Sequence, residues 1–307
     1  MKLLTVFASK RTELQADLLS RVLTRSGDLL HNENKIHMTL ERRQGLSAIE
    51  ISGRLPAFEL KKDGKRVYAE TAQALAEYII GEEEPLLLRK LIRDEYHYKQ
   101  EQELDQILSY CEQLLGSRSE NDPEKRAPFL RRKALIASEI ADYIQEQTEL
   151  HLDGFIRFRL QAYKQELHDI VEYAVDEYVM DRQYQEFISL LQYFVYIQEA
   201  KIPFVHLIHK GGSEFMLLND RMEKIDTDDP ETVVTVELLE KDMNFEDMIV
   251  STLITVSPQK IYIHTREPET QVIKTISQIF ENRVELCGYC RLCQNLDHST
   301  AAEYNKG

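Results

Sequence analysis

The sequence predicts an α+β protein with a small N-terminal α/β unit, a central helical block and a C-terminal α/β unit with a mixed or parallel sheet. Three observations support this. Short apolar runs typical of strands occur at both ends of the chain, apolar residues between them recur at helical spacing, and 307 residues suffice for more than one domain. We expect a β-α-β-β unit at residues 1–70, a helical domain at 71–200, an α/β domain at 201–298 and a flexible tail at 299–307.

The N-terminal unit is predicted from a change in period. Residues 3–7 are a continuous apolar run, typical of a buried strand. Residues 11–30 have apolar positions on one helical face, and Gly27 suits the end of that helix. Two further strands, 36–40 and 48–51, follow.

Two polar stretches are predicted as connections. Residues 61–66 contain Asp63 followed by Gly64, a dipeptide typical of a tight turn. Residues 117–128 carry two prolines and lack periodicity, which indicates a linker between two helices.

The helical block is predicted from amphipathic spacing. One face contains Leu104, Ile107, Leu108, Cys111, Leu114 and Leu115. Because Cys111 lies on this apolar face, we interpret it as a small core residue. The stretch Phe187–Val195 is apolar enough to predict a central position.

The C-terminal unit alternates strands and helices. Residues 204–209 and 215–218 flank Lys210–Ser213, which predicts a hairpin. Further predicted strands are 233–236, 261–264 and 284–287, and predicted helices are 245–254 and 272–280. This alternation favours right-handed crossovers and a small parallel or mixed sheet, with the chain's cysteines at the carboxyl end of its last strand.

Charge and hydropathy narrow the class of protein. The chain has 38 basic and 53 acidic residues, a net charge of −15 that repels nucleic acid. A basic run at residues 125–133 is best interpreted as a solvated helix entrance, with nucleic-acid binding as a weaker hypothesis. A mean hydropathy of −0.42 argues against an integral membrane protein. The apolar run at the N-terminus is too short for a secretory signal and is typical of a β-strand. We therefore expect a cytoplasmic protein with reduced thiols.

Three of the four cysteines form a C-x2-C-x2-C cluster near the end of the chain. Cys287, Cys290 and Cys293, with His298 five residues later, could form a Cys3His zinc site. Unliganded reduced thiols without a cofactor are the favoured interpretation, the zinc site is the second and a redox dithiol the third. A ferredoxin-type iron–sulfur cluster would need a fourth cysteine.

Common catalytic motifs are absent from the sequence. It contains no G-x-x-x-x-G-K-[ST], G-x-G-x-x-G, H-E-x-x-H or G-x-S-x-G pattern. A possible ligand site remains at the strand ends near Lys210, His264, Thr265, Arg266 and the cysteines, since α/β folds often bind ligands there.

The chain also resembles a known family. Tyr78–Glu84, Asp153–Leu160 with Tyr163, and the three clustered cysteines are similar to the YtxC-like family of sporulation proteins. The resemblance implies a cytoplasmic protein linked to spore formation with undefined biochemical activity, and no family site residues can be carried over.

We therefore expect a sporulation-associated protein that works through protein–protein contacts, with a partner protein or as a homo-oligomer, and without catalysis, membrane insertion or nucleic acid. The alternative is an enzyme or nucleotide-responsive protein with its site at the strand ends of the C-terminal domain.

Overall fold

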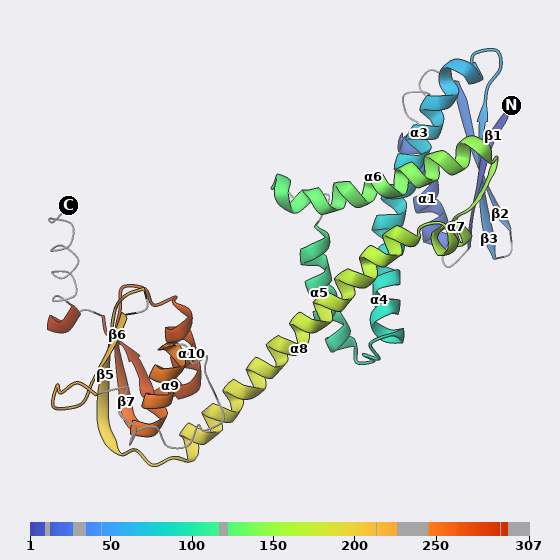
Figure 1. Ribbon diagram of the computed structural model, residues 1–307. Helices are drawn as coiled ribbons and strands as arrows, with labels where there is room; N and C mark the ends of the chain where they lie inside the picture. Colours follow the sequence, from blue (N-terminus) through green and yellow to red (C-terminus); the bar gives the residue numbers. More distant parts are fainter. Residues whose placement is uncertain are drawn as a thin grey trace, which may run out of the picture. The chain divides into compact units, whose positions relative to one another are not determined.

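The predicted α+β class is confirmed. The computed structural model describes residues 1–9, 13–26, 35–43, 45–116, 122–212, 214–225, 245–288 and 290–293. Its contacts divide the chain into two compact units, Met1–Met180 and Asp181–Gly307, each with its own four-stranded sheet (Figure 1). The boundary falls within one long helix, α8 (Gln161–Ile197).

The first unit combines a small sheet with a helical block. Its elements are, in chain order, β1 (Lys2–Ser9), α1 (Glu13–Ser26), β2 (Ile36–Arg43), β3 (Leu46–Gly53), α3 (Leu60–Tyr78), a π-helical turn η1 (Ile79–Glu83), α4 (Glu84–Asp94), α5 (Glu101–Leu115), α6 (Pro123–Glu146), β4 (Glu149–His151), α7 (Leu152–Phe158) and the first part of α8. The strand order is β2-β3-β1-β4. β1 pairs antiparallel with β3 and parallel with β4, where Val6 lies opposite Leu150. The chain therefore leaves the sheet after β3, forms the helices α3 to α6, and returns to complete it.

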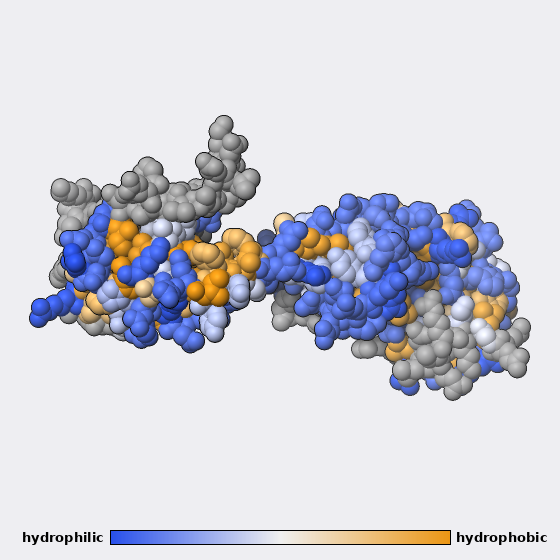
Figure 2. Space-filling view, turned by 90° about the horizontal axis from the view of Figure 1, so that it is seen from below, coloured by the Kyte–Doolittle hydropathy of each residue, from blue (hydrophilic) through white to orange (hydrophobic). Residues whose placement is uncertain are grey.

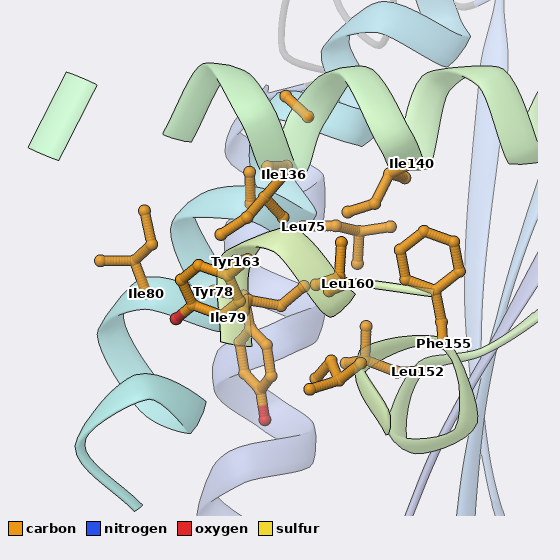
Figure 3. Packing of buried hydrophobic residues seen from close by; sticks show 14 of the residues in the cluster. Leu75, Tyr78, Ile79, Ile80, Ile136, Ile140, Leu152, Phe155, Leu160 and Tyr163 are labelled. Carbon is orange, nitrogen blue, oxygen red and sulfur yellow. The ribbon is translucent and has the colours of Figure 1, made fainter. Parts of the chain in front are cut away.

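One continuous apolar core joins the helices of the first unit. Leu75 of α3, Ile136 of α6, Phe155 of α7 and Tyr163 of α8 point toward one another (Figure 3). Leu75, Ile136 and Tyr163 are inaccessible to solvent, and Cys111 of α5 is as well, as its position on the apolar face predicted. The amphipathic spacing thus identified the buried faces of these helices.

The predicted turn at residues 61–66 is wrong, because this stretch forms the start of α3. The Asp63 carboxylate accepts a hydrogen bond from the backbone N–H of Glu59 at 3.0 Å, which satisfies a donor that a helix start leaves unpaired. Gly64 is buried, and a Cβ there would lie 3.0 Å from Leu60 Cδ1. In this protein Asp63 and Gly64 belong to the first turns of a helix, where the aspartate pairs with the helix start and the glycine packs closely against Leu60.

The predicted linker at residues 117–128 is wrong in its second half. Pro123 and Pro128 both belong to α6, while residues 117–121 lie outside the described part of the chain. Pro123 occupies the first helical position, where no intrahelical N–H is needed. The Asp122 carboxylate caps the helix by accepting from Glu124 N–H at 3.0 Å.

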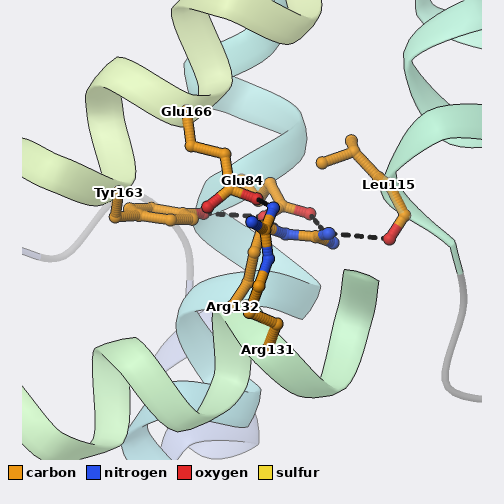
Figure 4. Close-up of polar contacts among 6 residues, drawn as sticks. All are labelled: Glu84, Leu115, Arg131, Arg132, Tyr163 and Glu166. Atoms are coloured by element: carbon orange, nitrogen blue, oxygen red, sulfur yellow. Dashed lines mark hydrogen bonds and ion pairs between the residues drawn. The ribbon is translucent and has the colours of Figure 1, made fainter. Parts of the chain in front are cut away.

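The basic run 125–133 lies in α6, and its interpretation as solvated is wrong at Arg132, which is 1% exposed. Arg132 donates to the Glu84 carboxylate at 3.0 and 3.2 Å and to the Leu115 carbonyl at 2.7 Å (Figure 4). The Tyr163 hydroxyl donates to the same carboxylate at 2.9 Å. The neighbouring Arg131 pairs with Glu166 at the surface. Arg132 therefore stabilises the packing of the four helices α4, α5, α6 and α8.

The second unit is an α/β domain with a mixed sheet, as predicted. Its elements are the second part of α8, then β5 (Ile202–Gly211), β6 (Glu214–Leu218), α9 (Phe245–Val256), β7 (Pro258–His264), α10 (Gln271–Phe280), a 3-10 turn η2 (Glu281–Arg283) and β8 (Val284–Leu286). The strand order is β6-β5-β7-β8, with β6 antiparallel to β5 and the other pairs parallel. The predicted strand 233–236 lies outside the described residues.

The expectation that Phe187–Val195 is central is wrong. Of its residues only Ile188 and Val195 are buried, in the core that α8 shares with α9, α10 and the sheet, while Phe187 and Leu190 are 54% and 64% exposed. Figure 2 shows hydrophobic surface over this part of α8. Apolar composition alone cannot show which face of a helix meets a neighbour. Within the described part of the chain, no helix has the length and apolar character needed to cross a membrane.

Candidate metal centre

The strands β7 and β8 bring a histidine and a cysteine to one edge of the second sheet. The parallel register sets Ile263 beside Leu286, so the next residues, His264 and Cys287, follow side by side. The backbone N–H of Cys287 donates to the Ile263 carbonyl at 2.9 Å, which extends the pairing beyond β8. The cysteine cluster thus begins at the carboxyl end of a strand, as predicted.

The chain then returns over this edge and adds two more thiols. Cys290 lies just before residues 291–293, which are helical and include Cys293. The Cys293 sulfur lies 3.8 Å from the Cys287 sulfur and 3.9 Å from the Cys290 sulfur. His264 Nδ1 lies 3.4 Å from the Cys293 sulfur and 3.5 Å from the Cys290 sulfur.

These distances match the edges of a tetrahedral zinc site. Zn–S bonds of about 2.3 Å and Zn–N bonds of about 2.0 Å at tetrahedral angles place sulfurs about 3.8 Å apart and nitrogen about 3.5 Å from sulfur. All four ligand atoms of His264, Cys287, Cys290 and Cys293 lie within 4.8 Å of one another. The cluster could therefore hold a metal ion.

Protonation states at the cluster also suit metal binding. Burial lowers the pKa of His264, helped by the neighbouring His206, so the imidazole is neutral at pH 7 and can ligate. Burial and the adjacent thiols raise the pKa of Cys287 to about 11. At Cys290 burial acts to raise the pKa, but the backbone N–H groups of Cys293 and Leu292 outweigh it and leave the pKa below the ordinary thiol value. A bound cation would be needed to deprotonate Cys287 at neutral pH.

The spacing suggested His298 as the fourth ligand, and the described residues offer a second candidate. His298 lies outside the described residues, and the imidazole beside the thiols is that of His264, 23 residues before Cys287. The sequence did contain a signal for it: His264 ends a predicted strand and Cys287 ends the next one. Neighbouring parallel strands would bring these ends together.

The remaining thiol, Cys111, is not part of the cluster. It is buried in the core of the first unit, and burial raises its pKa to about 12. All four cysteines are free thiols. Cys111 is therefore a packing residue, in agreement with the sequence interpretation.

The strand ends proposed for an alternative ligand site coincide with this cluster. The side chain of His209 on β5 contacts Thr265 Oγ1 at 2.8 Å and the Gly212 carbonyl at 3.0 Å. Thr265 Oγ1 also accepts from the Glu267 N–H at 2.9 Å. Thr265 thus helps to order the loop that follows His264.

A second group of candidate ligands, His168, Asp169 and Glu172, lies on the surface of α8. Its two carboxylates are exposed, and His168 Nε2 already contacts Glu95 at 2.9 Å. Exposed acidic clusters are common without a metal, so this group lacks the enclosed geometry of the cysteine cluster.

Comparison with known proteins establishes the family. A sequence model of the YtxC-like family matches residues 69–285. The chain belongs to the YtxC-like family. The uncharacterized protein YtxC of Bacillus subtilis (strain 168) is 27% identical over 253 residues, which cover 80% of this chain and 83% of that protein. No solved structure matches the chain.

The family resemblance drawn from the sequence is thereby confirmed. The motifs at Tyr78–Glu84 and Asp153–Leu160 lie within the segment that matches the YtxC-like family, and so does His264. The three clustered cysteines follow directly after it.

Proposed function

We propose that this YtxC-like protein is a non-catalytic, sporulation-associated protein of the cytoplasm that works through protein contacts and whose C-terminal unit is held together by a structural zinc ion. The observation that carries the proposal is the set of four protein ligands. Catalytic zinc sites use three protein ligands and keep a position open for water or substrate, whereas structural sites are closed. Cys287, Cys290, Cys293 and His264 would fill all four positions of such a site.

Zinc suits this donor set better than the other biological metals. Thiolates and imidazole in a tetrahedral arrangement favour Zn²⁺, while magnesium and calcium require oxygen ligands. The bound ion would connect the end of β7 to the segment after β8, so its removal should loosen β8 and α10 and leave the first unit unchanged.

Elemental analysis of protein purified without chelator tests the zinc. We expect about one zinc per chain, with loss of zinc and of thermal stability in Cys290→Ser. Cys111→Ala is the matched control, because that thiol lies in the other unit and its loss should leave the zinc content unchanged. Sub-stoichiometric zinc in the wild type, with an unchanged melting temperature for Cys290→Ser, would exclude a structural metal.

The second part of α8 supports the proposed protein contacts. Phe187, Leu190, Phe194 and Ile197 recur at spacings of three and four residues, which places them on one helix face, and they are 46–64% exposed. This is the a/d spacing with which one helix packs against another. Residues 187–198 contain no charged side chain, in a protein with a net charge of −15.

We commit to a second copy of the chain as the partner of this face. An uncharged apolar face lets two acidic chains approach without like-charge contact, whereas a basic partner would be expected to meet acidic side chains there. The contact is small, so the dimer should be weak and concentration-dependent.

Sedimentation analysis tests the contact. Because a small interface gives a weak dimer, protein concentrations of up to about 100 µM are needed. We expect a monomer–dimer equilibrium that Leu190→Asp abolishes. Ser189→Asp is the control, since residue 189 points about 100° away from residue 190 around the helix. A wild type that stays monomeric, or a Ser189→Asp variant as impaired as Leu190→Asp, would contradict self-association through this face.

The link to spore formation rests on the family resemblance, and the cytoplasmic location is supported by four free thiols. Deletion of the gene in a spore-forming host should lower the yield of heat-resistant spores. Normal spore yield in the deletion strain would count against the sporulation role and would leave the metal site untouched.

A further inference from the structure

A second histidine lies directly behind the metal-facing one. His206 of β5 and His264 of β7 lie on the same face of the sheet, and His206 Nδ1 is 3.0 Å from His264 Nε2. The other nitrogen of His264, Nδ1, faces the sulfurs of Cys290 and Cys293. The imidazole of His264 therefore bridges the thiol cluster and His206.

Neighbouring aromatic rings on the same sheet face hold His206 in place. Its ring centre lies 5.6 Å from that of Tyr262, at 32°, and 5.5 Å from that of Phe204, at 68°. The β5–β7 register places His206 directly opposite Tyr262. Two strands and two aromatic side chains thus fix the direction in which His206 Nδ1 points.

The hydrogen bond between the two rings decides which nitrogen of His264 can bind a metal. A neutral imidazole has one N–H and one lone pair. If His206 Nδ1 accepts, His264 carries its proton on Nε2 and presents the Nδ1 lone pair to the thiols. If His206 Nδ1 donated instead, His264 would carry its proton on Nδ1 and could not ligate.

We propose that His206 is a positioning residue for the metal site: it accepts the Nε2–H of His264 and holds that side chain in the tautomer and orientation that let Nδ1 bind the ion. The inference rests on the proposed metal site and adds to it a residue that does not touch the ion. Ligand histidines commonly donate their second N–H to such a partner, whose loss costs about 10–100-fold in metal affinity.

The test compares metal affinities of full-length variants by competition with a chromogenic zinc chelator. His206→Phe keeps an aromatic ring between Phe204 and Tyr262 but has no acceptor, and we expect it to bind zinc about 10–100-fold more weakly. His206→Asn supplies an amide oxygen near the position of Nδ1 and should recover most of the affinity. Lys260→Gln, on the same strand as His264, removes only an exposed ion pair with Glu285; it is the control and should bind like the wild type.

A spectroscopic readout separates positioning from a general packing effect. In the zinc-bound wild type, ¹⁵N NMR of His264 should show a protonated Nε2 and a metal-bound Nδ1, and in His206→Phe the Nε2–H signal should exchange with water faster. Cobalt substitution should give the same tetrahedral Cys3His absorption in the wild type and His206→Phe, but an altered spectrum in His264→Ala.

The outcomes distinguish this inference from the proposed function. A wild type that binds zinc tightly while His206→Phe binds it equally well would overturn the role of His206 and leave the metal site standing. Metal bound through Nε2 of His264 would also overturn it. A wild type without zinc or cobalt binding would overturn both.

Discussion

Replacing Arg132 with alanine should be among the most damaging single changes in the first unit. The guanidinium donates two hydrogen bonds to the Glu84 carboxylate and one to the Leu115 carbonyl, and neither Arg132 nor Glu84 is more than 5% exposed. Without it, Glu84 keeps only the Tyr163 hydroxyl as a partner among the residues that the structure describes. A buried carboxylate would then lack a counter-charge.

The expected loss is about 3–5 kcal/mol of unfolding free energy, the usual cost of removing one partner of a buried ion pair. Arg131→Ala on the same helix is the matched control. That side chain is 69% exposed and pairs with Glu166 at the surface, so its loss should cost about 1 kcal/mol or less.

Hydrogen exchange measures the loss best, because unfolding of the two units need not coincide and one overall transition would not isolate the first. We expect the protected amides of α3, α6 and α8 to exchange faster in Arg132→Ala, with no change in β5 and β7. Replacing both partners, as Arg132→Met with Glu84→Leu, should restore much of the stability, since no buried charge remains.

The loss of unfolding free energy in Arg132→Ala should also depend on pH. Burial raises the pKa of Glu84, although Arg132 and Tyr163 counteract it, and removing Arg132 should raise this pKa further. A carboxyl with a raised pKa in the folded state favours folding when protonated, and this contribution is lost as the pH rises through the folded-state pKa. Arg132→Ala should therefore be less destabilised at pH 5 than at pH 8. Equal losses for Arg132→Ala and Arg131→Ala, or a pH trend of the opposite sign, would refute this reasoning.

Three further predictions concern other features of the first unit. After metal removal, iodoacetamide should label Cys290 of the native protein, whose pKa lies below the ordinary thiol value, and mass spectrometry should find Cys111 unmodified, because burial raises its pKa to about 12. The pKa of Asp63 is lowered, chiefly by the hydrogen bond from Glu59. The ionised carboxylate therefore stabilises the fold at neutral pH, and this contribution is lost as the pH falls through the folded-state pKa. The melting temperature of Asp63→Asn should be lower than that of the wild type at pH 7, and the two should converge in acid. Gly116→Ala should destabilise by more than about 1 kcal/mol in urea unfolding, because φ is +64° and a Cβ would lie 2.1 Å from the Lys125 carbonyl, whereas Gly81→Ala, with open space around it, should not.

Periodicity predicted most of the fold because burial repeats along each element. The strands at both ends, the hairpin around Lys210–Ser213 and the helix α9 all emerged from their patterns. The start of α3 did not, since Asp63-Gly64 is compatible with a turn or with a helix start. The outcome depends on a side-chain hydrogen bond to Glu59 that local composition does not reveal.

The sequence revealed only part of the candidate metal centre, for a similar reason. Three cysteines at C-x2-C-x2-C spacing are a local signal, but His264 joins them through the register of two parallel strands. Likewise, the apolar composition of residues 187–195 does not reveal that α8 packs against its neighbours through a narrow face around Ile188 and Val195. Contacts made between distant segments require the tertiary structure.

The position of β4 has a consequence for the order in which the protein can fold during synthesis. The backbone of β1 at Thr5–Phe7 is paired by residues Glu149–His151, about 140 residues later in the chain. At translation rates of about 5–20 residues per second, that edge of β1 waits roughly 7–30 s for its partner. During this interval the nascent sheet presents an open edge, the kind of surface on which chains associate wrongly. The helices α3 to α6 emerge from the ribosome in the same interval, before the strand that completes the sheet.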